Sequence, residues 1–138
     1  MENKINHITV SVSDLNRSIA FYQDVFGAKL IVHGPRMAYF DLDGLWLALN
    51  EENLPDRTFS NTYTHIAFTI CEDQLDEFTE KLKRNGAVIE KGRKRHLLEK
   101  DSIYFRDPDG HLFEFHTGTL TDRISYYKSQ QANMLFFD

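Results

Sequence analysis

Residues 6–12 read Asn-His-Ile-Thr-Val-Ser-Val, and residues 64–70 read Thr-His-Ile-Ala-Phe-Thr-Ile. In both stretches apolar side chains recur at every second position, which is the period of a β-strand with one buried face. His7 and His65 therefore lie on the opposite, less apolar faces of their strands. Because both stretches carry their histidine at the same place, we infer that the chain contains an internal repeat.

The residues that follow extend this repeat. Each strand leads into a segment with helical spacing of apolar residues, 15–26 in the first half and 73–85 in the second, and each segment stops at a glycine. Asp43-Gly44 and Asp109-Gly110 are hairpin signals between the last two strands of each half. The strands expected after the helices are 29–33, 37–41 and 45–50, and 88–91, 102–106 and 111–116.

Each half therefore reads βαβββ, and the predicted fold class is α+β with paired βαβββ modules. We expect a single domain over residues 1–138, with modules at about 4–50 and 62–120 and a C-terminal tail. Since four short strands make an open-edged sheet, each module must be closed by another one. The polar stretch 51–61, which contains Pro55, is long enough to act as a linker between the modules.

Composition excludes several classes of protein. The net charge of −5 argues against a nucleic-acid partner, and the single cysteine, Cys71, excludes an internal disulfide framework. The longest apolar run, residues 45–49, is far shorter than the roughly 20 residues that span a bilayer. The polar start of the chain shows no signal peptide. We expect a soluble, cytoplasmic protein with no membrane partner.

The repeat also indicates a metal site. Alignment of the two Asp-Gly turns places Ala48 opposite Glu114, so that His7, His65, Ala48 and Glu114 occupy four equivalent inward positions. Three of these positions carry metal-binding side chains and the fourth is an alanine. Two imidazoles and one carboxylate suit a divalent first-row metal, and the alanine leaves coordination positions for water and substrate. His116 shares a face with Glu114 and is a candidate to support that ligand.

At this point the sequence resembles the vicinal oxygen chelate (glyoxalase) superfamily, in which paired βαβββ modules form a cup around a metal. More narrowly, it resembles the fosfomycin-resistance metallothiol transferases over nearly the whole chain. The residues that carry the resemblance are 5–7, 38–40, 44–52, 63–68, 102–105, 107–111, 114–120, Arg123 and 126–127.

The resemblance implies that a low-molecular-weight thiol opens the epoxide of fosfomycin at a divalent metal, Mg²⁺ or Mn²⁺, with Zn²⁺ possible in crystals. It implies metal ligation by His7, His65 and Glu114, the residues that the repeat also selects. It further implies a homodimer with swapped modules, in which His7 of one subunit joins His65 and Glu114 of the other. The implied substrate-binding positions are Tyr39, Trp46, Asn50, Tyr63, Arg93, Ser102, Tyr104 and Arg123.

Different residues of this chain resemble two branches of the family, which use different thiols. Thr9 is similar to the glutathione-using branch, where a threonine hydroxyl lies near the epoxide, which implies a catalytic role for Thr9 beside Glu114. Residues 39–40, 49–52 and 126–127 resemble the bacillithiol-using branch. Because more positions follow the second branch, we expect bacillithiol or L-cysteine as the thiol. The loop 92–100 fits neither branch, and its role stays open.

Other functions remain as alternatives: a glutathione-using transferase, a fosfomycin epoxide hydrolase, another superfamily enzyme such as an isomerase or extradiol dioxygenase, or a non-catalytic drug-binding module. The hydrolytic branch uses a glutamate base near residues 41–43, where this chain has Asp-Leu-Asp. The intact set of three ligands argues against a module that only binds a drug.

Overall fold

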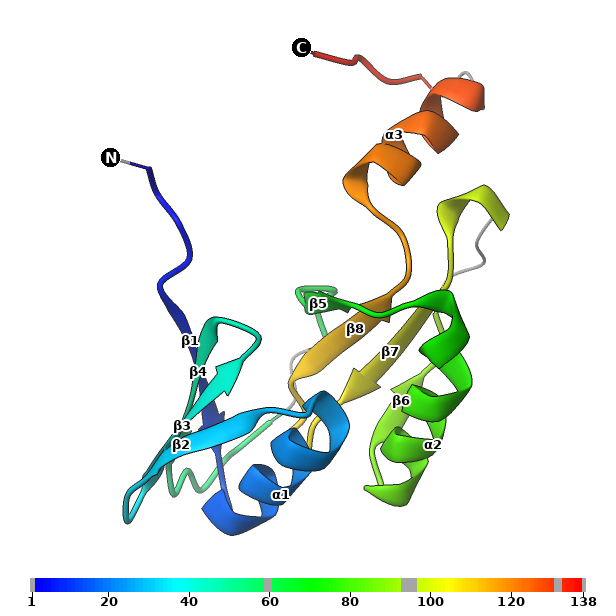
Figure 1. Ribbon diagram of the computed structural model, residues 1–138. Helices are drawn as coiled ribbons and strands as arrows, with labels where there is room; N and C mark the ends of the chain where they lie inside the picture. Colours follow the sequence, from blue (N-terminus) through cyan, green and yellow to red (C-terminus); the bar gives the residue numbers. More distant parts are fainter. Residues whose placement is uncertain (1, 59–60, 93–96, 131–132, 138) are drawn as a thin grey trace.

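The computed structural model describes residues 2–58, 61–92, 97–130 and 133–137 (Figure 1). The first half contains β1 (His7–Val12), α1 (Leu15–Phe26), β2 (Lys29–His33), β3 (Met37–Leu42) and β4 (Leu45–Glu51). The second half contains β5 (Ile66–Thr69), the 3₁₀ helix η1 (Glu72–Gln74), α2 (Leu75–Arg84), β6 (Val88–Glu90), the 3₁₀ helix η2 (Leu97–Glu99), β7 (Ser102–Arg106) and β8 (Leu112–His116). The helix α3 (Leu120–Ser129) follows.

The two halves form two four-stranded sheets with equivalent strand orders, β1-β4-β3-β2 and β5-β8-β7-β6. In each sheet the first strand pairs in parallel with the last one. The register repeats as well, since Thr9 pairs with Ala48 and Ala67 pairs with Glu114. The predicted α+β fold with two βαβββ modules is confirmed. Ala48 and Glu114 hold equivalent positions in the two sheets, as the sequence suggests.

The alternation in β1 sorts its side chains as the period predicts. Val10 and Val12 are buried in the core, whereas His7 and Thr9 are exposed. α1 begins at Asp14, whose carboxylate accepts a hydrogen bond from the backbone N–H of Arg17, and it ends at Gly27, which has a φ of 65°. Both ends of this helix match the sequence prediction.

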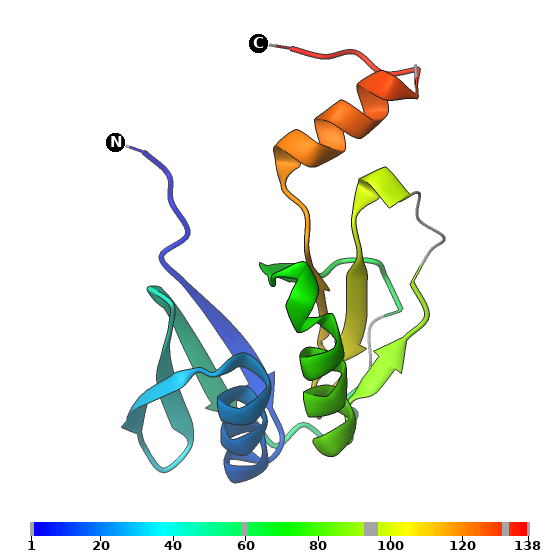
Figure 2. The same ribbon diagram turned by 45° about the vertical axis from the view of Figure 1, so that its right-hand side comes forward.

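The two modules share one core. The ring of Phe26, at the end of α1, lies 5.0 Å from the ring of Phe68 and 5.4 Å from the rings of Phe113 and Phe115, all in the second module. Figure 1 and Figure 2 show that the two sheets are separate from each other, and that α1 and α2 lie next to each other. The helix α3 projects beyond the second sheet. Each sheet therefore keeps one face turned away from the shared core.

Polar contacts also join the modules. The backbone N–H of Ser13 donates to the Asp109 carboxylate over 3.0 Å, and the Tyr22 hydroxyl donates to Asp107 over 2.6 Å. Both acids belong to the Asp-Pro-Asp-Gly-His motif at 107–111. This motif therefore connects the second module to the entry and the middle of α1.

Two features differ from the predicted elements. The second helix is preceded by the 3₁₀ turn η1, in which the side chain of Gln74 accepts a hydrogen bond from the backbone N–H of Cys71. The expected tail contains α3, which starts with a capping box between Thr119 and Asp122.

Residues 52–58 and 61–65 connect the sheets without helix or strand, and the predicted linker, 51–61, overlaps this connection. Across the described ranges, every helix is too short or too polar to cross a bilayer.

Candidate metal centre

Glu114 is a buried acid in the middle of β8, and it lies beside the ring of His65. The Oε1 atom of Glu114 lies 3.0 Å from Nε2 of His65, which stands immediately before β5. The parallel pairing of β5 with β8 brings these residues together, although the sequence separates them widely. A buried carboxylate of this kind needs a proton, a donor or a cation as its partner.

The other ring nitrogen of His65 shows what that partner can be. Nδ1 lies 2.6 Å from the carbonyl oxygen of Tyr63. Because a carbonyl only accepts, Nδ1 carries the proton, and Nε2 of the neutral imidazole is itself an acceptor. Two acceptors thus face each other, and a proton or a metal cation must lie between them. Two ligand atoms that each lie about 2.1 Å from one cation, at right angles to each other, are about 3 Å apart. The spacing of the two acceptor atoms therefore fits a divalent metal.

Behind Glu114 lies Ser102, at the start of β7. Its hydroxyl oxygen is 2.5 Å from Oε2 of Glu114 and 2.6 Å from Nδ1 of His116. Nδ1 of His116 is also 3.4 Å from Oε2 of Glu114. The resemblance implies a substrate contact for Ser102, and in the structure its hydroxyl lies against two side chains of β8.

A pocket of about 400 Å³ opens beside this group. The hydroxyls of Tyr63 and Tyr104 in its wall lie 2.6 Å apart, and both rings contact the ring of His65, with centroids 4.8 Å and 5.4 Å away. The structure therefore gathers one group of predicted site residues around the second sheet. The residues that line the pocket are Tyr63, His65, Ala67, Tyr104, Glu114, His116, Arg123 and Tyr127.

Arg123 reaches this pocket from α3. One of its terminal nitrogens lies 3.8 Å from Oε2 of Glu99, a buried acid in η2. The guanidinium also lies 5.9 Å from the ring centre of Tyr127. The sequence analysis missed Glu99, because its only signal is an acid beside two leucines in a loop of open role. Arg93, predicted in the same loop, lies outside the described residues.

The other predicted residues lie on the first sheet. Nδ1 of His7 is 2.6 Å from the side-chain oxygen of Asn6, so that His7, like His65, presents Nε2 as an acceptor. The His7 ring packs against Trp46 with centroids 4.4 Å apart, and Trp46 contacts Tyr39 at 5.2 Å. Thr9 and Asn50 are exposed on neighbouring strands of this sheet.

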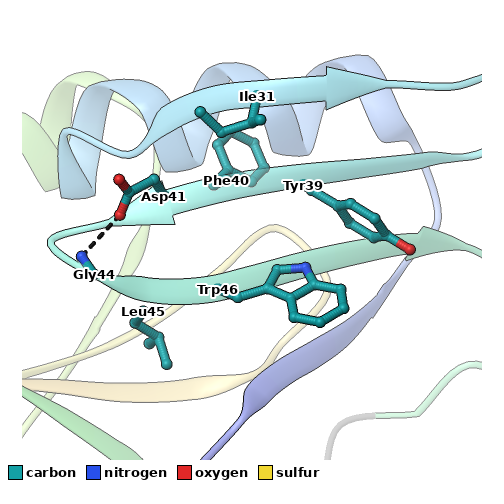
Figure 3. Close-up of a pocket in the computed structure, with 7 residues that line it drawn as sticks. All are labelled: Ile31, Tyr39, Phe40, Asp41, Gly44, Leu45 and Trp46. Carbon is teal, nitrogen blue, oxygen red and sulfur yellow. Dashed lines mark hydrogen bonds between the residues drawn. The ribbon is translucent and has the colours of Figure 1, made fainter.

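Beside Trp46 the first sheet is hollowed into an apolar pocket of about 350 Å³ (Figure 3). Figure 3 shows the rings of Tyr39 and Trp46 side by side on neighbouring strands, while Asp41 accepts a hydrogen bond from the backbone N–H of Gly44 in the hairpin turn. This pocket lies beside Trp46, whose ring packs against His7, and its lining is mainly apolar. The lining residues are Ile31, Tyr39, Phe40, Asp41, Gly44, Leu45 and Trp46.

The predicted site therefore lies in two parts. His65 and Glu114 meet on the second sheet, whereas His7 lies with Trp46 on the first. Among the residues that the structure describes, no three His, Cys, Asp or Glu side chains of this one chain meet as a metal site. Each part nevertheless presents a histidine Nε2 that is oriented to accept.

Comparison with known proteins identifies the class to which this arrangement belongs. Residues 4–115 match the family described as Glyoxalase/Bleomycin resistance protein/Dioxygenase superfamily, and the chain belongs to this superfamily. Within it, the chain belongs to the family of metallothiol transferases named FosB. It is 57% identical to Metallothiol transferase FosB of Lysinibacillus sphaericus, over 97% of this chain and 96% of that protein. It is 50% identical to the FosB of Staphylococcus saprophyticus, over 100% of this chain and 92% of that protein. The resemblance seen in the sequence is confirmed.

Solved structures give the same picture. The fosfomycin resistance protein FosX of Listeria monocytogenes, complexed with Mn(II) and sulfate, has a TM-score of 0.82 at 41% identity, covering 92% of this chain and 99% of that chain. A variant of the same Listeria protein is complexed with Mn(II) and 1S,2S-dihydroxypropylphosphonic acid, with a TM-score of 0.81 at 42% identity, covering 92% of this chain and 99% of that chain. These relatives are metal-containing proteins of the same fold.

Proposed function

We propose that this chain is a metal-dependent transferase that opens the epoxide of fosfomycin with a low-molecular-weight thiol and so confers resistance to the antibiotic. The observation that carries the proposal is the 57% identity with a metallothiol transferase over 97% of the chain. The His65–Glu114 pair supports it, because two facing acceptors suit a cation. A module that only binds a drug has no need of such a pair.

In the proposed centre His65 and Glu114 of one subunit and His7 of a second subunit bind one divalent cation, Mn²⁺ or Mg²⁺. The Mn(II) in the Listeria relatives supports this choice, as does the mixed nitrogen and oxygen donor set. When bound, such a cation acts as a Lewis acid toward the oxygen that gains negative charge as the epoxide opens.

The second subunit is part of the proposal because one chain supplies the ligands on two separate sheets. His7 and His65 are oriented alike, each through Nδ1, yet His7 begins β1 of the first sheet and His65 stands immediately before β5 of the second. A homodimer with swapped modules would bring the first sheet of one subunit over the second sheet of the other. It would also cover the open edges of both sheets.

The residues around the centre would hold the substrate. The guanidinium of Arg123 and the hydroxyls of Tyr63 and Tyr104 line one pocket, where they can donate charge-assisted hydrogen bonds to a phosphonate. From the first sheet of the partner, Tyr39 and Trp46 would close the pocket.

The resemblance and the positions of the residues in the fold suggest roles for three more residues, Thr9, Asn50 and Arg93. Thr9 stands two residues after His7 on the same face of β1, so its hydroxyl would lie next to the reacting epoxide. Asn50 of the partner subunit is a further proposed contact with the substrate, and so is Arg93.

Bacillithiol or L-cysteine is the proposed thiol, on the strength of the residues that resemble the bacillithiol branch. A low-molecular-weight thiol stays reduced in a reducing compartment, so we place the reaction in the cytoplasm. The polar surfaces of the pocket beside Arg123 suit a charged and hydrophilic co-substrate.

The direct test incubates the purified protein with fosfomycin, one thiol and one metal, and analyses the products by mass spectrometry. Bacillithiol, L-cysteine and glutathione are each paired with Mn²⁺, Mg²⁺ and Zn²⁺. We expect the thiol adduct of fosfomycin with bacillithiol or L-cysteine, and no adduct after the metal is chelated. The absence of an adduct in every combination would refute the proposal.

One observation favours a second candidate, hydrolysis of the epoxide. The phosphonic acid bound to the Listeria variant carries two hydroxyls, and addition of water to the epoxide of fosfomycin gives such a diol. The same assay without thiol distinguishes the two functions. Formation of the diol at a rate equal to that of the adduct would favour the hydrolase.

A further inference from the structure

Ser102 links two side chains of the neighbouring strand. β7 and β8 pair antiparallel, with Ser102 opposite His116 and Tyr104 opposite Glu114. The pairing places the Ser102 hydroxyl between them, 2.5 Å from Oε2 of Glu114 and 2.6 Å from Nδ1 of His116. Because the backbone register determines these positions, the contacts belong to the sheet itself rather than to a mobile surface side chain.

The protons in this group have one consistent arrangement. A serine hydroxyl carries a single hydrogen, and the ionised carboxylate of Glu114 can only accept, so Ser102 donates to Glu114. The Ser102 oxygen must then accept from His116, whose Nδ1 carries a proton. The three residues therefore form a directed chain of hydrogen bonds that runs from His116 through Ser102 to Glu114.

This chain determines how Glu114 is presented. Its hydrogen bond holds Oε2, while Oε1 is directed at His65. The last torsion of a glutamate side chain is broad and soft, so an unsupported carboxylate would rotate and lose that arrangement. We propose that His116 and Ser102 are positioning residues that set the metal affinity of Glu114 through this chain. The inference rests on the proposed function, because it takes Glu114 as a metal ligand.

Gly118 supports the arrangement from the other side of His116. A Cβ atom at Gly118 would lie 2.9 Å from Nε2 of His116 and 2.8 Å from the Cγ atom of Lys100. A side chain at this position would push the imidazole out of place. In the His-Thr-Gly run at 116–118, His116 therefore supplies the donor imidazole, and Gly118 leaves the space that this imidazole occupies.

The test measures Mn²⁺ binding alone, by isothermal titration calorimetry on the full chain, without fosfomycin or thiol. Loss of an outer partner of a metal ligand lowers metal affinity about 10- to 100-fold, so we expect that weakening for Ser102→Ala and for His116→Ala. Ser102→Thr keeps the hydroxyl, and His116→Asn keeps an uncharged N–H near the position of Nδ1. Both should bind Mn²⁺ nearly as tightly as the original chain.

Non-additivity is the decisive readout. Because His116 acts through Ser102, His116→Ala should cause no further loss in a chain that already carries Ser102→Ala. Ser18→Ala is the matched control, since it removes a buried hydroxyl for which the described residues offer no hydrogen-bond partner. It should leave Mn²⁺ binding unchanged, and circular dichroism should show all variants folded.

Three outcomes overturn the inference, and they separate it from the proposed function. Equal losses from His116→Ala with and without Ser102, or unchanged affinity in both single variants, would refute the positioning chain alone. A chain that does not bind Mn²⁺ before any substitution would refute the proposed metal centre and, with it, this inference.

Discussion

His7 and His65 acquire the same orientation from different partners. The side-chain oxygen of Asn6 holds Nδ1 of His7, and the backbone carbonyl of Tyr63 holds Nδ1 of His65. In both cases the hydrogen bond selects the tautomer that leaves Nε2 as an acceptor. Two halves of a duplicated chain have thus kept the chemistry of the repeated histidine while the supporting residue differs.

Arg123 gives the prediction at this scale. A cation that contacts a phosphonate binds the substrate and the transition state about equally, so its loss raises KM more than it lowers kcat. We expect Arg123→Ala to raise the KM for fosfomycin by about 10- to 100-fold, with kcat changed only a few-fold. Steady-state kinetics over a range of fosfomycin concentrations measures both constants.

Lys128 offers a matched control on the same helix, because Lys128→Ala removes a cation that lies over the ring of Phe136 rather than beside the pocket. Its KM should equal that of the original chain. An Arg123→Ala protein with unchanged KM and kcat would show that the contact with Glu99 is the whole role of Arg123.

Among the elements, the Asp-Pro-Asp-Gly turn before β8 has a role that reaches beyond its hairpin. Asp107 accepts hydrogen bonds from the backbone N–H groups of Asp109 and His111 and from the Tyr22 hydroxyl of α1. One buried carboxylate therefore holds its own turn and the helix of the other module. Burial raises the pKa of Asp107 above its usual range, although His111 and these hydrogen bonds act in the opposite direction.

The raised pKa of Asp107 predicts a pH dependence of stability. Since the folded state favours the neutral carboxyl, this contribution is fully present below the unfolded pKa of about 3.9, and it is lost as pH rises through the folded pKa. We expect the unfolding free energy of the original chain, relative to Asp107→Asn, to fall as pH rises from about 4 and then to level off. Urea denaturation at a series of pH values measures it.

Asp122 is the control of opposite sign. Hydrogen bonds from Thr119 lower the pKa of Asp122 at the start of α3. Its contribution is therefore present above the unfolded pKa and is lost as pH falls, so the comparison with Asp122→Asn should slope the other way. A relative stability of the original chain that increases with pH against Asp107→Asn would contradict the role given to burial.

For the molecule as a whole, the two sheets share a core through α1 but present their functional residues separately. The ring of Phe26 joins the first module to the second, while Trp46 and His7 lie away from Glu114 on another sheet. One chain therefore holds both parts of the proposed site without combining them. This arrangement is the physical basis for the proposed exchange of modules between two copies.

Subunit mixing tests that exchange. His7→Ala and Glu114→Ala proteins, each inactive, are refolded together in equal amounts. If the site is shared, one site of each heterodimer carries both lesions and the other carries none. Random pairing makes about half of the dimers heterodimers, so about a quarter of the original activity should return.

Two differently tagged chains, purified in series, verify that the heterodimer has formed. Each variant refolded alone provides the baseline, which should stay near zero. A verified heterodimer without activity would mean that each chain builds its own complete site, and the swapped arrangement would be wrong.

Local sequence patterns predict much of the fold of this protein. The duplicated strands, the first helix with its end at Gly27, and the equivalent positions of Ala48 and Glu114 in the two sheets all follow from periodicity and turn residues, which act over a few positions. α3 carries a readable capping box at Thr119 and Asp122, so its absence from the prediction reflects an unused signal.

Other features depend on residues that only the tertiary structure brings together. The Ser102 hydroxyl faces Glu114 and His116 because of strand register, and Glu99 meets Arg123 because η2 packs against α3. No local pattern marks such contacts, since their energy comes from burial and hydrogen bonding between distant parts of the chain. The sequence alone determined which side chains could bind a metal, and the packing of the two modules decided that His7 lies apart from His65 and Glu114 within one chain.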